Sequence, residues 1–238
     1  MNASDFFTSD YVSLLKLIQK GDKAKAQAVI GQGLSLDVHG KDGITPLFWL
    51  ILKNDMPAID LALQLGANPN FAESKYGDTP LNSILGGSTK DDALVKLLLK
   101  NGANPNIPNR NGSPALFAAI GGDSRTQIDL LLAHGADINL QDKLHRNAAL
   151  YTTYLNKFDL TYYLIERGGD YTNRATTGAD IAWSIHDKLT SNLLSPEFPA
   201  YGWALKLKAL LESKGIVFPP PSPAEVRAQW AKDKSQPK

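Results

Sequence analysis

The chain has 238 residues, a formal net charge of +1 at pH 7 and 43% apolar residues. A charge this close to neutral excludes a bulk electrostatic attraction to nucleic acid or to anionic membranes. The sequence contains no cysteine, which excludes disulfides, thiolate nucleophiles and cysteine-based zinc sites. No apolar stretch approaches the roughly 18 residues needed to span a bilayer, so we expect no membrane-spanning helix.

The N-terminal segment is polar. Residues 1–5, Met-Asn-Ala-Ser-Asp, lack the basic start and apolar core of a secretion signal. The sequence leaves the compartment unknown: cytoplasmic by default, or periplasmic if a leader has been removed. Two helices are predicted next, at 11–20 and 23–30, and they form the first helix pair of the chain.

A five-residue pattern, Gly-Ala-Asn/Asp-x-Asn, then recurs along the chain. It stands at 66–70, 102–106 and 135–139, and a degenerate copy, Gly-Gly-Asp-Tyr-Thr, stands at 168–172. The first glycines of these copies are separated by 36, 33 and 33 residues. A near-constant period of about 33 residues is typical of a stacked repeat protein, in which each repeat packs on its neighbours. Such a protein usually works by presenting a surface.

A longer helix is predicted before each glycine of the pattern, at 91–100, 126–133 and 159–167. Acidic residues lie at or near the start of these helices, where the positive end of the helix dipole favours them. The glycine follows the end, where a left-handed cap needs a residue without a Cβ.

A shorter helix is predicted before each longer one, within residues 43–51, 77–85 and 112–120. Thr45 and Thr79 are expected to cap the first two of these helices, and the proline that follows each threonine suits a first turn, where no N–H partner is needed. The repeating unit is therefore a turn, a short helix, a tight loop, a longer helix and a glycine-terminated loop.

These motifs resemble the ankyrin repeat family. Its Thr-Pro-Leu-His signature is matched by Thr-Pro-Leu at 45–47 and 79–81, with weaker copies at 114–117, 147–150 and 180–183. The resemblance implies an all-α fold: an ankyrin-repeat solenoid of stacked helix-turn-helix units with short β-turn or hairpin loops.

The resemblance also divides the chain, which we expect to form a single ankyrin-repeat domain over 1–238. Its predicted parts are an N-terminal capping repeat at 10–40, four central repeats at 41–173, a C-terminal repeat at 174–218 with an insertion at 186–203, and a Pro-rich tail at 219–238. A short helix is predicted inside that tail, at 224–234.

The family's histidine after Thr-Pro-Leu is absent from every copy, and its place is taken by Phe48, Asn82, Phe117, Leu150 and Trp183. That histidine normally links neighbouring repeats by hydrogen bonds. Its mostly apolar replacements predict repeats held together more by side-chain packing.

No constellation of residues predicts catalysis. The four histidines, His39, His134, His145 and His186, are separated by whole repeats, and no zinc-protease, phosphate-loop or dinucleotide-binding motif is present. The acidic pair at 91–92 is interpreted as charge at a helix start. We therefore expect no catalytic residue, no cofactor and no metal.

The resemblance places partner contacts on a concave face built from the loop tips and the exposed side of the shorter helices. Tyr76 and Tyr154 are the expected anchors, because tyrosine is enriched at binding hot spots. Five cations at tip positions, Lys41, Lys75, Arg110, Lys143 and Arg146, are predicted to form a basic stripe that attracts an acidic partner surface. The full predicted surface is Lys41, Asp42, Ile44, Leu52, Lys53, Lys75, Tyr76, Asp78, Arg110, Asn111, Ser113, Lys143, Leu144, Arg146, Tyr154 and Leu155.

Several functions remain open on these features. The first is a non-enzymatic module that binds a protein partner, and within it an inhibitor or immunity protein that neutralises a bacterial toxin or effector enzyme. This form is suggested by a short chain, expected to be complete, with irregular repeats and a Pro-rich tail. The alternatives are a periplasmic stress-protective or scaffold protein, a host-directed effector, and an enzyme with a site in 186–203. The oligomeric state is unknown.

Overall fold

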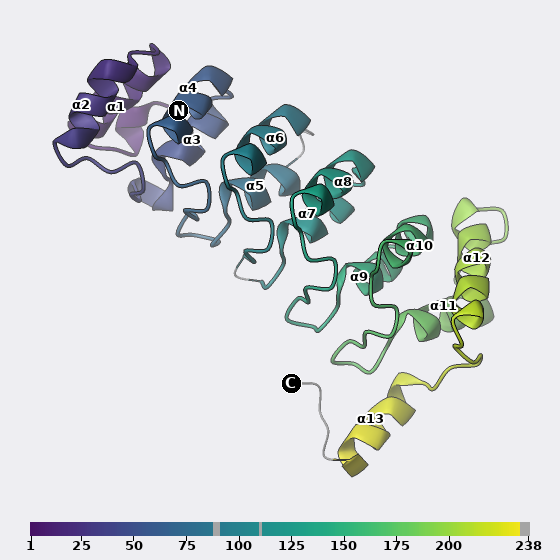
Figure 1. Ribbon diagram of the computed structural model, residues 1–238. Coiled ribbons are helices and arrows are strands. Elements are labelled where there is room, and N and C mark those ends of the chain that lie inside the picture. The colour runs from purple at the N-terminus through teal and green to yellow at the C-terminus, as the bar shows by residue number, and fades with distance from the viewer. Residues whose placement is uncertain (88–90, 110, 234–238) are drawn as a thin grey trace. The chain divides into compact units, whose positions relative to one another are not determined.

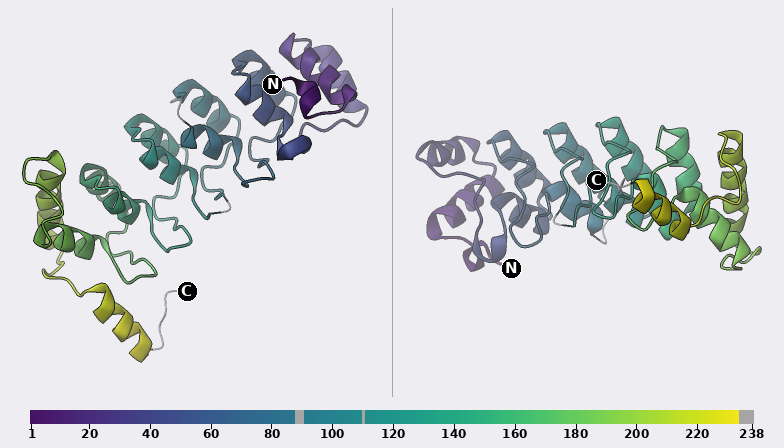
Figure 2. Two further views of the ribbon diagram at one scale, coloured as in Figure 1. Left: turned by 180° about the vertical axis from the view of Figure 1, so that it is seen from behind. Right: turned by 90° about the horizontal axis from the view of Figure 1, so that it is seen from below.

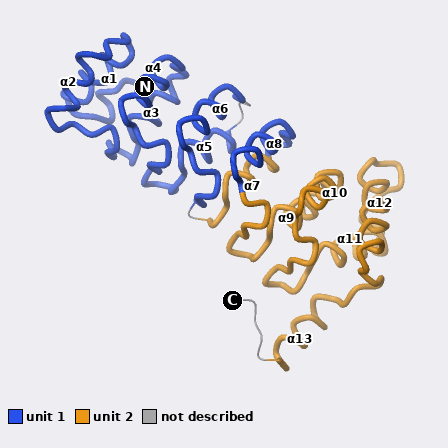
Figure 3. Tube along the Cα trace, viewed as in Figure 1, with its two compact units in different colours: residues 1–110, 122–136 blue, residues 111–121, 137–238 orange. Residues whose placement is uncertain are grey.

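The computed structural model describes residues 1–87, 91–109 and 111–233, and every regular element in that part of the chain is a helix (Figure 1). The fold is the expected all-helical one, with helices joined in pairs by short loops. The chain divides into two compact units (Figure 3): residues 1–110 with 122–136, and residues 111–121 with 137–238. That residues 1–238 form one domain stays a prediction.

The first unit contains seven α-helices and two short 3₁₀ helices among its described residues. They are η1 (Ala3–Asp5), α1 (Ser9–Gln19), α2 (Lys23–Gly31), η2 (Lys41–Gly43), α3 (Pro46–Leu52), α4 (Met56–Gln64), α5 (Pro80–Gly86), α6 (Asp92–Lys100) and α8 (Arg125–Ala133). Within this unit α1, α3 and α5 lie side by side, and α2, α4, α6 and α8 form a second row (Figures 1 and 2). Leu15, Leu50, Ile59 and Leu98 are fully buried between the rows.

The second unit contains α7 (Ala115–Gly121), α9 (Ala148–Tyr154), α10 (Phe158–Glu166), α11 (Ile181–Thr190), α12 (Pro199–Ser213) and α13 (Pro223–Asp233). Phe158, Leu164 and Leu207 are fully buried where α10 packs on α9 and α12. The helices α11 and α12 both extend into the segment expected as an insertion, so only residues 191–198 lie between them.

In each helix pair we call the first helix the inner helix and the second the outer helix. Polar side chains cap the inner helices α3, α5, α9 and α11, as the sequence indicates. The Thr45 hydroxyl accepts a hydrogen bond from the Phe48 N–H at 3.2 Å, and the Thr79 hydroxyl does the same for the Asn82 N–H. In the degenerate copies Asn147 and Asp180 take over this role through their side-chain oxygens. Each cap satisfies one of the N–H groups that a helix start leaves without a partner.

The recurrent Gly-Ala-Asn-x-Asn pattern has a structural explanation. Its first Asn closes a turn onto the last one: Asn68 Oδ1 accepts from the Asn70 N–H at 2.9 Å. The Asn70 side chain then reaches the next repeat, where Nδ2 donates to Gly102 O at 2.9 Å and Oδ1 accepts from the Asn104 N–H at 2.7 Å. Asn139 makes the same two bonds, to Gly168 O and from the Asp170 N–H, inside the second unit. The period of the sequence is therefore a period of inter-repeat hydrogen bonds.

Side-chain packing replaces part of the inter-repeat contact that the family's histidine would make. Phe48, Phe117 and Leu150 are buried, as their apolar character predicts. Asn82, however, donates from Nδ2 to Ile107 O at 3.0 Å, so this copy keeps a hydrogen bond to the next repeat. His39 also links two repeats, because its Nε2 lies 2.9 Å from Ala72 O. Polar links thus persist beside the packing.

Neighbouring loop tips touch closely. A Cβ on Gly43 would lie 2.2 Å from the Ser74 hydroxyl, and a Cβ on Gly112 would lie 2.8 Å from the Lys143 side chain. Both glycines have positive φ angles, so they combine a left-handed backbone with a close approach that no larger residue permits. The Ser74 N–H donates to Gly43 O across the same contact.

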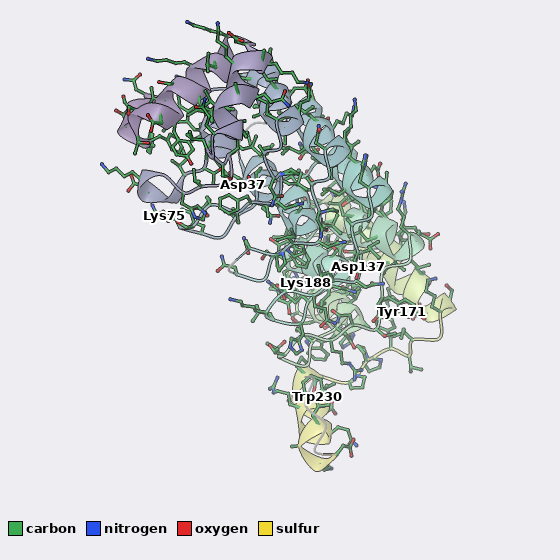
Figure 4. The ribbon with its side chains drawn as sticks, turned by 60° about the vertical axis from the view of Figure 1, so that its left-hand side comes forward. Asp37, Lys75, Asp137, Tyr171, Lys188 and Trp230 are labelled. Atoms are coloured by element: carbon green, nitrogen blue, oxygen red, sulfur yellow. The ribbon has the colours of Figure 1, made fainter. Side chains whose placement is uncertain are left out.

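The Pro-rich tail folds back on the last loop. A Cβ on Gly178 would lie 2.8 Å from Pro223 O, Val226 of α13 is buried, and Arg227 donates to Thr177 O. Thus α13 covers the 174–180 loop in the way that the following tips cover Gly43 and Gly112. Trp230, labelled in Figure 4, lies further along the same helix and is half-buried.

Candidate functional site

The predicted contact residues fall into two groups. One group lies at the loop tips that precede the inner helices, and the other lies at the C-terminal ends of those helices. An inner helix of seven residues such as α3 is about 10 Å long. The two groups of one repeat are therefore separated by about one helix length and lie at opposite ends of it.

The tips of the first unit expose both charge and aromatic surface. Lys41, Asp42 and Lys75 are exposed, and Tyr76 is 59% exposed. The Lys75 ammonium lies 4.9 Å from the centre of the Tyr76 ring, so cation and ring form one surface element. The hydrogen bond to Tyr76 raises the pKa of Lys75.

Glu73 fixes the shape of this tip. Its carboxylate accepts hydrogen bonds from the N–H groups of Lys75, Tyr76 and Asp78 at 2.7, 2.6 and 3.1 Å. Three donors on one carboxylate hold the tip in a single conformation, and Tyr76 is therefore presented on an ordered loop.

Asp78 and Ile44 are half-buried and contribute less surface than the sequence suggests. Burial raises the pKa of Asp78 above its ordinary 3.8, the Glu73 carboxylate adds to this, and a hydrogen bond with Asn109 opposes it. A buried carboxylate near another carboxylate opposes folding when it is ionised.

In the second unit, Lys143 and Leu144 are exposed at the tip, and Leu144 is 49% exposed. Asn111 is exposed and Ser113 is half-buried at the preceding tip. Arg110 lies outside the described residues. The apolar side chain next to a lysine repeats the Lys75–Tyr76 pairing of the first unit.

Arg146 forms an ion pair with the buried Asp142 carboxylate. Its Nε donates to Asp142 Oδ2 at 2.9 Å, its side chain is only 17% exposed, and that of Asp142 is 4% exposed. The guanidinium also lies about 5 Å from the rings of Tyr151 and Tyr154. Asp142 further accepts from the N–H groups of Leu144 and Arg146 itself. Arg146 thus stabilises its loop, and the exposed tip cations among the described residues are lysines.

The helix ends also carry exposed apolar side chains of the predicted surface. Leu52 is 58% exposed at the end of α3, beside the exposed Lys53. Tyr154 and Leu155, at the end of α9, are 44% and 38% exposed. Isolated exposed apolar residues are ordinary, but each of these pairs with a neighbour of the same predicted surface.

Sequence reasoning missed other exposed apolar residues and a groove. Leu193, Phe198, Leu205 and Val217 are all exposed in the C-terminal repeat, and no periodic signal marks them. A groove between α3 and α5 is lined by Leu52 among others. In the sequence, the glycine at the end of α5 is the feature that could have indicated this groove.

The described residues show no metal centre and no membrane-spanning helix. Across 1–87, 91–109 and 111–233, no three His, Asp or Glu side chains are grouped to hold a metal ion. In the same ranges, none of the helices combines the length and the hydropathy that crossing a bilayer requires.

Comparison with known proteins agrees with this geometry. A family described as "Ankyrin repeats (3 copies)" matches residues 85–175. This segment of the chain consists of ankyrin repeats. The ankyrin match spans α6 to α10 and includes three of the four copies of the glycine pattern.

Similar proteins come from several kingdoms. The chain is 29% identical over 163 residues to the human SH3 and multiple ankyrin repeat domains protein 2, which covers 68% of this chain and 8% of that protein. It is 26% identical over 183 residues to the ankyrin repeat protein OPG189 of monkeypox virus, covering 75% of this chain and 31% of the relative. It is 29% identical over 142 residues to an ankyrin repeat protein of Rickettsia bellii, covering 57% and 40%. The chain therefore spans less than half the length of these relatives.

Ankyrin repeats indicate a protein–protein interaction module, with a protein as the partner. The loop tips and helix ends described above carry exposed side chains.

Proposed function

We propose that this chain is a non-enzymatic module that binds another protein through its loop tips and inner-helix ends. The observation that carries the proposal is the exposure of large apolar side chains at these places, and Leu52, Tyr76 and Leu144 each adjoin a lysine in the sequence. Tyr76 at 59% and Leu52 at 58% serve the first unit, and Leu144 and Tyr154 serve the second. Aromatic and apolar anchors of this kind dominate the energy of protein interfaces.

The lysines of this surface favour a partner with an acidic face. Lys41, Lys53 and Lys75 are exposed in the first unit and Lys143 in the second, whereas the chain as a whole is nearly neutral. Local charge complementarity of this kind speeds association and selects partners more than it adds affinity.

Within this class we propose an inhibitor or immunity protein that masks a toxic enzyme. The support is the sequence: irregular repeats and a Pro-rich segment without a catalytic motif. In this role the acidic face of the enzyme would be covered by the tips, and inhibition would follow from blocked access to its active site.

Site-specific photo-cross-linking tests the surface. Benzoylphenylalanine replaces Tyr76 or Tyr154 in turn, and a matched control carries it at Lys100, which is exposed on the outer helix α6. The proposal predicts one partner protein cross-linked from both tyrosine positions and not from position 100. Capture mainly from position 100 would place the interface elsewhere.

The inhibitor form has its own readout. The captured partner, purified as an enzyme, should lose its activity when this chain is added at equal concentration. Charge reversal at Lys41, Lys75 and Lys143 should slow that inhibition and reduce its salt dependence. A captured partner whose activity is unchanged at saturation would overturn the inhibitor role while leaving the binding module intact.

A further inference from the structure

Two lysines of the second unit hydrogen-bond to the C-terminal end of the first helix of the preceding repeat. Lys188 of α11 donates from Nζ to Thr153 O at 3.0 Å and also to Asn156 Oδ1. Lys157 donates from Nζ to Ile120 O at 3.0 Å. Carbonyl groups at a helix C-terminus have no partner within the helix, and a lysine from outside satisfies them.

The two residues that accept hydrogen bonds from Lys188 have counterparts at the end of α3. Thr153 and Asn156 stand six and nine residues after their helix cap, and Ile51 and Asn54 stand six and nine residues after Thr45. The backbone agrees as well. Asn54 and Asn156 have φ angles of 53° and 57°, and each donates its N–H to the carbonyl three residues before it.

Among the residues that the structure describes, this junction has no lysine that corresponds to Lys188. Lys188 stands eight residues after its cap, Asp180, and the residue eight after Thr79 is Gly87. Instead of a lysine stem, the structure has a groove of about 710 Å³. Ile51, Leu52, Ile84 and Leu94 form its apolar lining, and Asn54 and Asp91 are among its polar groups.

The polar groups of the groove suit an ammonium. Asp91 caps α6 with one carboxylate oxygen, which accepts from the Leu94 N–H at 2.9 Å. Within the described part of the chain, no hydrogen bond reaches its second oxygen. Among the described residues, no side chain hydrogen-bonds to the Asn54 amide. An ammonium carries three donors, and the methylene stem of a lysine packs on apolar walls of this kind.

We propose that this groove receives a lysine side chain from a partner protein. The partner's lysine supplies an ammonium at the end of α3, as Lys188 of this chain does at the end of α9. Its methylene stem fills the space that Gly87 leaves beside α3. The inference rests on the proposed function, because the groove lies at the helix ends of the same surface and shares Leu52 with it.

The test titrates the intact, isotope-labelled chain with acetyl-Gly-Lys-Gly-amide and follows backbone amide shifts by NMR. A saturable shift is expected at Asn54, Gly87 and Leu94, in the millimolar range for a single side chain. The same peptide acetylated on its lysine nitrogen should not saturate, because it keeps the stem and loses the charge. Equal binding of both peptides, or of neither, would overturn the proposal.

Matched variants assign the effect to the groove. Asp91→Ser keeps the helix cap and removes the charge, and it should weaken binding about fivefold. Asn54→Gly tolerates the positive φ, removes the amide oxygen and should weaken binding as well. Asp55→Ser makes the same cap substitution on α4, outside the groove, and should change nothing. A loss of affinity in the Asp55 variant equal to that in the Asp91 variant would refute the assignment.

A Lys90→Ala variant tests whether a lysine of this chain occupies the groove. Lys90 lies outside the described residues. If the peptide saturates the groove only in a Lys90→Ala variant, the occupant is this chain's own lysine and the partner is excluded. The titration uses the isolated chain, so its outcome is independent of cross-linking at Tyr76 and Tyr154. Failure of one leaves the other standing.

Discussion

Asn70 provides the sharpest test of what holds the repeats together. Replacing it with alanine removes the bond from Nδ2 to Gly102 O and the bond from the Asn104 N–H to Oδ1, at 2.9 and 2.7 Å. Each such bond contributes about 1 kcal/mol net, and the two groups left behind lie near solvent, which limits the added desolvation cost. We therefore expect Asn70→Ala to lower the free energy of unfolding by about 2 kcal/mol.

Urea denaturation followed by circular dichroism measures this change. Asn70→Asp keeps the acceptor and loses the donor, so it should lose about half as much. Because the lost bonds join two repeats, the transition of Asn70→Ala should also broaden, since repeat proteins owe their cooperativity to nearest-neighbour interfaces. Asn139→Ala tests the same contact in the second unit.

A change of less than about 0.5 kcal/mol in Asn70→Ala would refute this reasoning, because that is the size of an ordinary surface substitution. It would mean that water replaces the asparagine side chain without loss. The recurrence of the pattern would then reflect the turn made by its first Asn and not the bridge made by its last.

Three further predictions follow from the loops and the tail. Asp78→Asn should raise the melting temperature at pH 7, because a raised pKa means that ionisation of Asp78 opposes folding. The gain should vanish as the pH falls below about 4, where Asp78 of the parent chain is protonated in both the folded and the unfolded state. Arg146→Ala should cost about 3 kcal/mol in urea unfolding, because it leaves the Asp142 carboxylate buried and unpaired, whereas Lys143→Ala should stay within about 0.5 kcal/mol of the parent. Val226→Ala should cost about 1.5 kcal/mol and act locally, so hydrogen exchange of α13 amides should accelerate while α9 and α10 keep their protection; unchanged exchange in α13 would show that Val226 does not hold it.

The predicted surface was only partly accessible to sequence reasoning. The exposure of Tyr76, Leu144 and Tyr154 agrees with their expected places at tips and helix ends. Arg146 looked like one more tip cation, because its sequence position is the same kind of turn. Its pairing depends on Asp142 being buried beneath it, and burial is a property of the folded loop.

The sequence by itself determined the repeating unit. Caps such as Thr45 and Thr79, the prolines after them and the glycines that end the longer helices act over three or four residues, so their meaning is local and readable in order. The 33-residue period follows from Asn70 and its counterparts, which must recur wherever one repeat binds the next. These short-range signals were sufficient for the all-helical repeat fold.

Only the tertiary structure decided which junctions are closed and which are open. Lys188 and Gly87 hold the same place in their repeats, yet one fills a helix end and the other leaves a groove beside α3. The return of α13 onto the 174–180 loop was likewise invisible, because Val226 and Gly178 are 48 residues apart in the chain. Contacts of this kind depend on which surfaces meet after the repeats have stacked, and no local backbone preference encodes that meeting.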